Sequence, residues 1–145
     1  MTDASLDDFL TDDHDRLDEL IASFQDEKDE NPPRAAEALA EFTTSLLRHL
    51  TWEETILFPL YEEKTGQTAL TKTLLAEHED IRTWLVALNE KVAEGDTDCD
   101  HEAAMLVNEL GAHNGREEQI VYPQLDKLLS DEEKQATFGR MAAVE

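Results

Sequence analysis

The chain has 145 residues, 40% of them hydrophobic, a length and composition that suit a single domain with a substantial core. Its 35 acidic and 12 basic side chains give a net charge of −23, which should repel nucleic acid and anionic membrane surfaces. With one cysteine, Cys99, the chain can form neither an internal disulfide nor a thiolate-rich zinc or iron–sulfur site.

The first residues lack the basic and apolar regions of a signal peptide, and no apolar run reaches the ~18 residues that a membrane span needs. We therefore expect a cytoplasmic protein with no membrane partner. The acidity fits two interpretations, a heavily hydrated surface or adaptation to a salty cytoplasm, where salt screens the repulsion between carboxylates.

The first predicted helix begins near Ser5, which can cap it, with Asp8 three residues on as in a capping box. The polar stretch 25–33, which closes with two prolines, should end this helix. Apolar residues recur at helical spacing, so one face of this helix should point toward a core. The residues on that face are Leu10, His14, Leu17, Ile21 and Phe24, one of them a histidine.

The second helix is predicted from Pro33 to a break at 65–67. Pro59 lacks an amide donor, so we expect it to kink or loosen the helix. The inward stripe includes a histidine and a glutamate four residues apart, which places them on one face. Its members are Leu39, Phe42, Leu46, His49, Glu53, Ile56, Leu57 and Leu60.

The second half of the chain repeats this pattern at an offset of 64 positions. The third helix, about 70–93, has the inward residues Leu74, His78, Ile81, Leu85 and Leu88. After an acidic loop at 95–100, the fourth helix has Ala103, Leu106, Leu110, His113, Glu117, Ile120 and Val121. The offset pairs His14 with His78, His49 with His113, and Glu53 with Glu117.

The repeat predicts an all-α fold, an up-down-up-down four-helix bundle built from two similar helical hairpins. We expect one domain over 1–145, with the bundle at about 8–129 and an appendage at 130–145. A capping box at Ser130 should start a short C-terminal helix there, and Phe138 and Met141 are its candidate docking residues.

Such a bundle would bring six buried ligand groups together at mid-height. Each hairpin supplies a lone histidine and a His-x-x-x-Glu pair, so the candidate metal ligands are His14, His49, Glu53, His78, His113 and Glu117. Six ligands suggest two metal ions, each held by two histidines, with both glutamates bridging and octahedral positions left open. A lone histidine on an apolar face is more often a hydrogen-bonded core residue, but buried glutamates without a cation would cost several kcal/mol each.

Imidazole and carboxylate without sulfur suit iron, which we favour because two redox ions can share the electrons that O2 reduction needs; manganese and zinc are also possible. The apolar residues one turn away should wall the site and admit a small molecule such as O2 or NO. They are Leu10, Leu17, Leu46, Ile56, Leu74, Ile81, Leu110 and Ile120. The acceptors that fix the histidine tautomers cannot be assigned from sequence.

Several nearby residues are given no metal role. Glu54 and Glu118 lie about 100° off the ligand stripe, so we expect them at the surface or between helices. His101 has no counterpart in the repeat and is expected in an exposed loop. We also expect Trp52 and Trp84 to serve packing rather than redox chemistry.

The combined motif resembles the hemerythrin-like (HHE) cation-binding domain over about residues 8–129. In that family, two lone histidines and two His-x-x-x-Glu pairs, each followed by an aromatic residue and proline, hold a non-haem di-iron centre in a four-helix bundle. Here the aromatic–proline pairs are Phe58-Pro59 and Tyr122-Pro123. Oxygen-carrying members have a further histidine where this chain has Leu74 and an aspartate where it has Glu118, so the resemblance points to the four-histidine branch.

Three functions follow as alternatives. The first is capture of O2 or NO at a di-iron centre, for sensing or for protection against oxidative or nitrosative stress. The second is an enzyme that turns over peroxide or superoxide, or an iron donor for cluster repair, as the resemblance implies for some members. The third is a bundle that a closed metal site only stabilises. Whether the protein is an enzyme is left open.

Overall fold

A computed structural model describes residues 5–144, so the predicted domain limits at 1 and 145 lie outside the described residues. The first half consists of α1 (Leu6–Glu27) and a second helical arm. That arm is formed by α2 (Pro32–Trp52), the π-helical turn η1 (Glu53–Leu57) and α3 (Phe58–Thr65).

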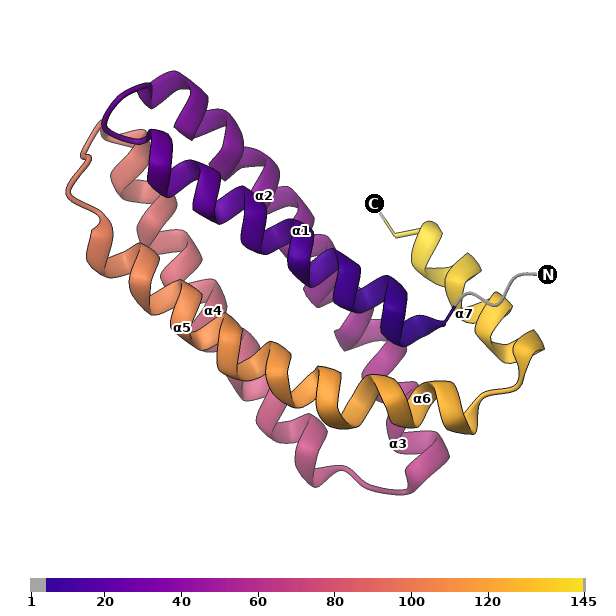
Figure 1. The fold of residues 1–145 in the computed structure, drawn as a ribbon. Coiled ribbons are helices and arrows are strands. Elements are labelled where there is room, and N and C mark those ends of the chain that lie inside the picture. The colour runs from indigo at the N-terminus through magenta and orange to yellow at the C-terminus, as the bar shows by residue number, and fades with distance from the viewer. Residues whose placement is uncertain (1–4, 145) are drawn as a thin grey trace.

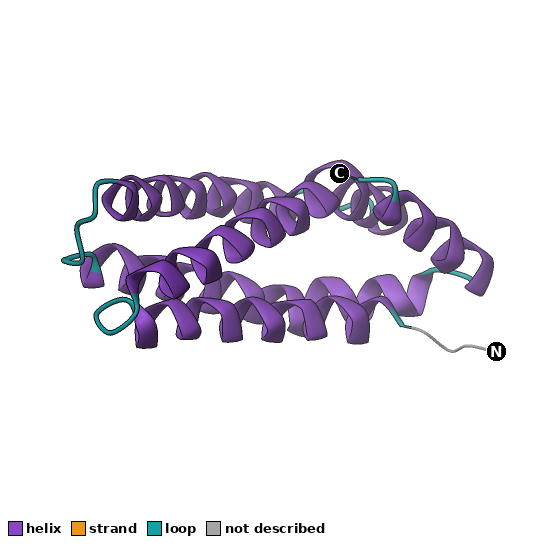
Figure 2. Ribbon diagram, turned by 90° about the horizontal axis from the view of Figure 1, so that it is seen from above, coloured by secondary structure: helices purple, strands orange, loops and turns teal. Residues whose placement is uncertain are grey.

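The second half repeats this order. It has α4 (Ala69–Ala93), then an arm formed by α5 (Asp100–Arg116), the π-helical turn η2 (Glu117–Val121) and α6 (Tyr122–Leu128). A short C-terminal helix, α7 (Asp131–Ala142), follows. Figure 1 shows α1 lying along α2 and α4 along α5, and Figure 2 shows the arms running lengthwise through the molecule. The fold is therefore the predicted all-α helical bundle with a short C-terminal helix.

The helix ends follow local side-chain chemistry. The Ser5 hydroxyl accepts a hydrogen bond from the Asp8 amide at 2.9 Å, which confirms the predicted cap of α1. Gly66 ends α3 with φ of 71°, a left-handed conformation that is costly for other residues. Ser130 and Glu133 form the predicted reciprocal capping box of α7.

Each π turn ends two residues before a proline, and η1 lies where Pro59 was predicted to kink or loosen the second helix. The Phe58 amide bonds to the Glu53 carbonyl, and the Tyr122 amide to that of Glu117, each five residues back. The aromatic residue after each turn is buried, Phe58 being 1% and Tyr122 0% exposed, whereas Ile120 within η2 is 40% exposed. The prediction that Ile120 lines the core was wrong: its repeat equivalent Ile56 is buried in the apolar cluster that contains Met141 of α7, whereas Ile120 lies in neither apolar cluster.

The core consists of two apolar clusters with a polar layer between them. One cluster contains Leu17, Leu46, Ile81 and Leu110; the other contains Leu10, Ile56, Leu74 and Val121. In α1 and α4, and in both arms, the change from one cluster to the other falls within a few residues of a predicted ligand histidine. The four histidines therefore lie at one level, enclosed by hydrocarbon at both ends.

Helix α7 packs on the second apolar cluster. Met141 is 2% exposed, and its carbonyl accepts a hydrogen bond of 2.9 Å from the indole of Trp52. Phe138 meets Phe9 edge-to-face, with 5.4 Å between ring centroids. The predicted docking residues of the tail are thus confirmed.

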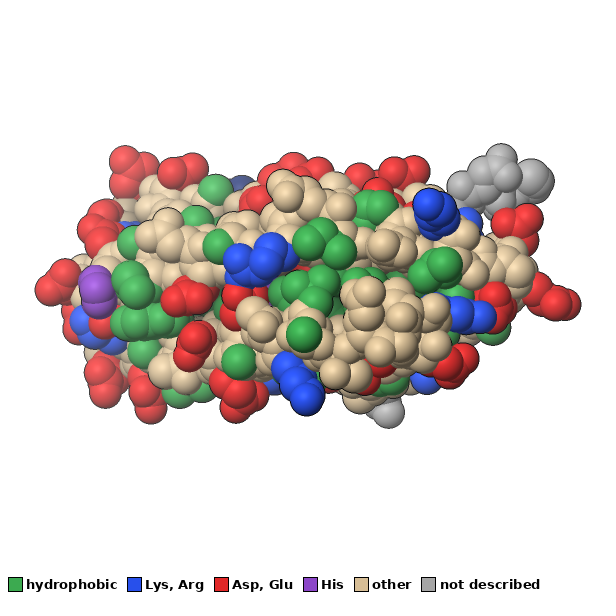
Figure 3. Space-filling view, turned by 90° about the horizontal axis from the view of Figure 1, so that it is seen from below, with side chains coloured by type: hydrophobic (Ala, Val, Ile, Leu, Met, Phe, Trp, Pro, Cys, Tyr) green, Lys and Arg blue, Asp and Glu red, His purple; other side chains and the backbone are tan. Residues whose placement is uncertain are grey.

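The surface carries the acidity of the chain. Figure 3 shows acidic side chains along the edges of one face, with apolar and basic side chains toward its middle. Among the described helices, none has the length and apolar character needed to span a membrane.

Candidate metal centre

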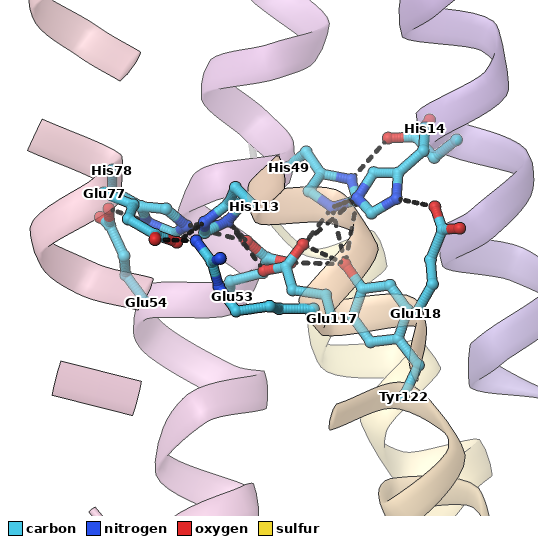
Figure 4. A network of polar contacts seen from close by, with 12 residues as sticks. His14, His49, Glu53, Glu54, Glu77, His78, His113, Glu117, Glu118 and Tyr122 are labelled. Carbon is cyan, nitrogen blue, oxygen red and sulfur yellow. Dashed lines mark hydrogen bonds and ion pairs between the residues drawn. The ribbon is translucent and has the colours of Figure 1, made fainter. Parts of the chain in front are cut away.

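The four predicted histidines form two pairs at the middle of the bundle. Nε2 of His14 lies 3.1 Å from Nε2 of His49, which joins α1 to α2. Nε2 of His78 lies 3.1 Å from Nε2 of His113, which joins α4 to α5. All four side chains are buried, and each ring turns its Nε2 atom inward (Figure 4).

The two predicted glutamates lie between these pairs, and each directs one oxygen toward either pair. Oε1 of Glu53 is 2.9 Å from Nε2 of His78, and its Oε2 is 3.3 Å from Nε2 of His49. Oε1 of Glu117 is 3.4 Å from Nε2 of His14, and its Oε2 is 3.0 Å from Nε2 of His113. Both carboxylates are 0% exposed.

The six residues therefore form two overlapping clusters that share the glutamates. The first position is surrounded by His14, His49, Glu53 and Glu117, and the second position by His78, His113, Glu53 and Glu117. In each cluster one ligand atom from every residue lies within 4.8 Å of the others. The structure brings all six predicted residues together, with two nitrogens and two carboxylates at each position.

Each histidine also contacts a carboxylate through its outer nitrogen, Nδ1. The distances from Nδ1 to the carboxylate oxygen are 2.7 Å for His14–Glu118, 2.8 Å for His49–Asp13, 2.8 Å for His78–Glu54 and 2.9 Å for His113–Glu77. Glu54 and Glu118 lie between helices, as expected, and they also contact two of the candidate ligands. The π turns carry both residues and direct them toward the lone histidines.

Sequence reasoning also missed Asp13 and Glu77 at this level. A signal was present, because Asp13 and Glu77 are 64 positions apart, as are Glu54 and Glu118. Each of these four carboxylates directly follows or precedes a candidate ligand in the chain. It therefore lies at the level of the metal centre along the bundle, but on a different face of its helix. Only the arrangement of neighbouring arms shows that this face meets a histidine.

These outer contacts provide a test of whether the centre fits metal ions. Carboxylates are acceptors only, so each Nδ1 carries the proton and donates it outward. In neutral rings the two Nε2 lone pairs of each pair then face each other at 3.1 Å, an arrangement that needs a cation between them. Oε2 of Glu117 is buried and lies 3.0 Å from His113 without forming a hydrogen bond. The donor set is that of an N/O metal site.

Without metal, protons are the available cations. Burial alone would lower the pKa of His49, but the charge of Glu53 and the hydrogen bond to Asp13 outweigh it and raise the pKa to about 10. Burial likewise opposes the charged form of His113, yet Glu117 and Glu53 raise its pKa to about 10. Burial would raise the pKa of Glu53, but its contacts with Glu117 and His49 hold that pKa well below its usual value.

Tyr122 is a further residue of the centre to which spacing assigned no role. Its hydroxyl donates to Glu53 at 2.5 Å, and its oxygen lies 3.0 Å from Oε1 of Glu117 and 3.2 Å from Nε2 of both His14 and His49. Burial and the two carboxylates raise its pKa well above 10, the usual value for tyrosine. In the metal-free centre the phenol therefore stays protonated beside the carboxylates.

A family model for the hemerythrin HHE cation binding domain matches residues 5–125, which include all six candidate ligands. The chain belongs to this family. No curated protein and no solved structure gives a significant match. As an HHE domain the chain has four histidines at its centre: Leu74 lies one turn before His78, and the fifth histidine, His101, is exposed at the start of α5.

The remaining expectations concern residues around the centre. Seven of the eight predicted wall residues are buried in the apolar clusters, and Ile120 is the exception described above. His101 is exposed as expected but lies on α5, edge-to-face with Trp84 at 5.5 Å. Cys99 is a buried free thiol at the start of α5, and burial raises its pKa.

Proposed function

We propose that this HHE domain binds two iron ions and captures O2 or NO, for sensing or for protection against oxidative or nitrosative stress. The observation that supports it best is the division of the oxygens of Glu53 and Glu117 between the two histidine pairs. Two imidazoles and two carboxylate oxygens at each position leave part of an octahedron for other ligands. Manganese and zinc are the competing metals.

The protein groups around each position have separable roles. Iron bound there would supply redox-active ions with open coordination positions. The six candidate ligands would hold it, while Asp13, Glu54, Glu77 and Glu118 fix the rings by accepting the Nδ1 protons. In the metal-free protein the hydroxyl of Tyr122 donates to Glu53 and lies 3.0 Å from Glu117, which holds it beside both shared carboxylates.

The surroundings of the centre favour a small, weakly polar ligand. Apolar clusters enclose the polar layer on both sides, so a polar organic substrate would meet few hydrogen-bonding partners. We propose that the protein has no nucleic-acid or membrane partner, because its acidic surface would repel these anionic partners. We further propose a cytoplasmic location, which the single free thiol, Cys99, supports.

Metal content after expression in iron-replete cells tests the proposal. We expect about two iron ions per chain, because two positions share the carboxylates. His49→Ala should lower the iron content, whereas His101→Ala, which removes an exposed histidine, should leave it unchanged. Two zinc ions and no iron in the wild-type protein would overturn the proposal in favour of a structural metal site.

Rapid mixing of the diferrous protein with O2, NO and peroxide separates capture from turnover. A stable adduct with O2 or NO supports capture. Repeated consumption of peroxide or superoxide in the presence of reductant would support the enzyme alternative instead. Transfer of iron to an acceptor protein without either reaction would support iron donation.

A further inference from the structure

The two halves of the centre match closely, so a side chain that differs between equivalent positions is informative. The ring of Tyr122 lies 5.6 Å from that of His14, at an interplanar angle of 37°. The ring of Phe58 lies 5.5 Å from that of His78, at 32°. Phe58 and Tyr122 are 64 positions apart and thus equivalent in the repeat. The difference between them is one hydroxyl group.

That hydroxyl lies among the groups that surround the first position. Its oxygen is within 3.2 Å of ligand atoms from all four residues there, His14, His49, Glu53 and Glu117. A metal ion held by those atoms would have the Tyr122 oxygen as an immediate neighbour. At the second position the equivalent ring, Phe58, offers carbon alone.

The carboxylates behind the histidines differ in charge balance as well. Glu54, behind His78, makes two contacts with Arg82, at 2.6 and 3.0 Å. Glu77, behind His113, forms an ion pair with Arg116. Both outer carboxylates of the second position are therefore neutralised by arginine.

The first position has an arginine partner at only one of its two outer carboxylates. Asp18 and Trp52 stand 64 positions before the two arginines. Asp13 has an ion pair of 3.7 Å with Arg16, and among the described residues no lysine or arginine is within 4.0 Å of the Glu118 carboxylate. A ligand that is anionic, or that gains negative charge on binding, therefore meets less repulsion at the second position.

We propose that Tyr122 fills a coordination position at the first metal and that the second metal, between His78 and His113, takes the exogenous small ligand. This inference rests on the proposed two-metal function. Under this proposal the two otherwise equivalent metal positions have different roles. Phe58 keeps the binding position at the second metal open because its ring offers no oxygen.

A reciprocal exchange of the two rings tests the assignment, with NO as the probe for the diferrous protein and azide for the diferric protein. The wild-type protein should bind one ligand for each pair of ions. Tyr122→Phe should open the first position and bind two. Phe58→Tyr should close the second, so that no ligand binds at either ion. The double variant should regain one ligand per pair, at the opposite ion.

Loading with Co(II) gives a readout that does not depend on iron or on ligand binding, because its visible absorption strengthens as the coordination number falls. Tyr122→Phe should strengthen the absorption and Phe58→Tyr should weaken it. Unchanged spectra and unchanged NO stoichiometry in both single variants would overturn this proposal while leaving the two-metal function intact. A wild-type protein that fails to take up two metal ions would instead refute the proposed function.

Discussion

Oε2 of Glu118 lies 2.7 Å from Nδ1 of His14, although 104 positions separate the two residues in the chain. This contact joins the π turn η2 to α1, and Glu54 makes the same contact with His78 at 2.8 Å. A carboxylate behind a ligand imidazole fixes the ring and increases its basicity. These outer contacts should therefore contribute to metal affinity without touching the metal.

We predict that Glu118→Ala lowers metal affinity by about 10- to 100-fold, because His14 loses the acceptor of its Nδ1 proton. Competition with a chelator of known affinity measures the change. Glu19→Ala removes an exposed carboxylate from the same bundle and serves as a control for net charge. Equal affinities for the two variants would contradict the role of Glu118.

A second prediction concerns the shared carboxylates. Glu53→Ala and Glu117→Ala should each abolish the spectrum of a magnetically coupled di-iron centre, because each removes an oxygen from both positions. Metal analysis with Mössbauer or magnetic measurements would show the loss. A variant that keeps two coupled ions would refute the bridging assignment.

The metal-free protein should become less stable as pH rises from about 6.5 to about 10. The pKa of His49 and of His113 is raised to about 10 in the folded state, against about 6.5 when unfolded. Their stabilising contribution is complete below the unfolded pKa and is lost as pH rises through the folded one. Denaturant unfolding in chelator measures this, and stability that rose across the window would contradict it.

Metal loading should show the opposite dependence on pH. A metal ion takes neutral imidazole, so loading at pH 8 displaces about two protons, one each from His49 and His113. Calorimetry in buffers of different ionisation enthalpy counts these protons. The exposed His101 provides the control, because His101→Gln should not alter the count. Loading with no proton release would show that the rings are already neutral.

The C-terminal helix should depend on its capping box. Ser130→Ala removes the acceptor for the Glu133 amide and should lower the free energy of unfolding by about 1 kcal/mol. Ser130→Asp keeps an acceptor and should retain most of the stability. Trp52 fluorescence reports docking of α7, because its indole bonds to the Met141 carbonyl. Equal losses in both variants would exclude capping as the cause.

The sequence determined the helical arms and the six candidate ligands. Helical periodicity shows which residues share an inward face, and the offset of 64 shows that His14 and His78 belong with the two His-x-x-x-Glu pairs. Both signals lie within one helix or one repeat. They require no knowledge of how neighbouring helices are rotated against each other.

The tertiary structure decided the partners of those ligands. Glu118 reaches His14 and Tyr122 reaches Glu53 from other arms, and both depend on a π turn that adds a residue to the helical turn before proline. A constant period of 3.6 residues cannot anticipate that shift. The face of a helix on which a residue lies follows from the local sequence. The side chain that it contacts on another helix depends on how the whole bundle packs.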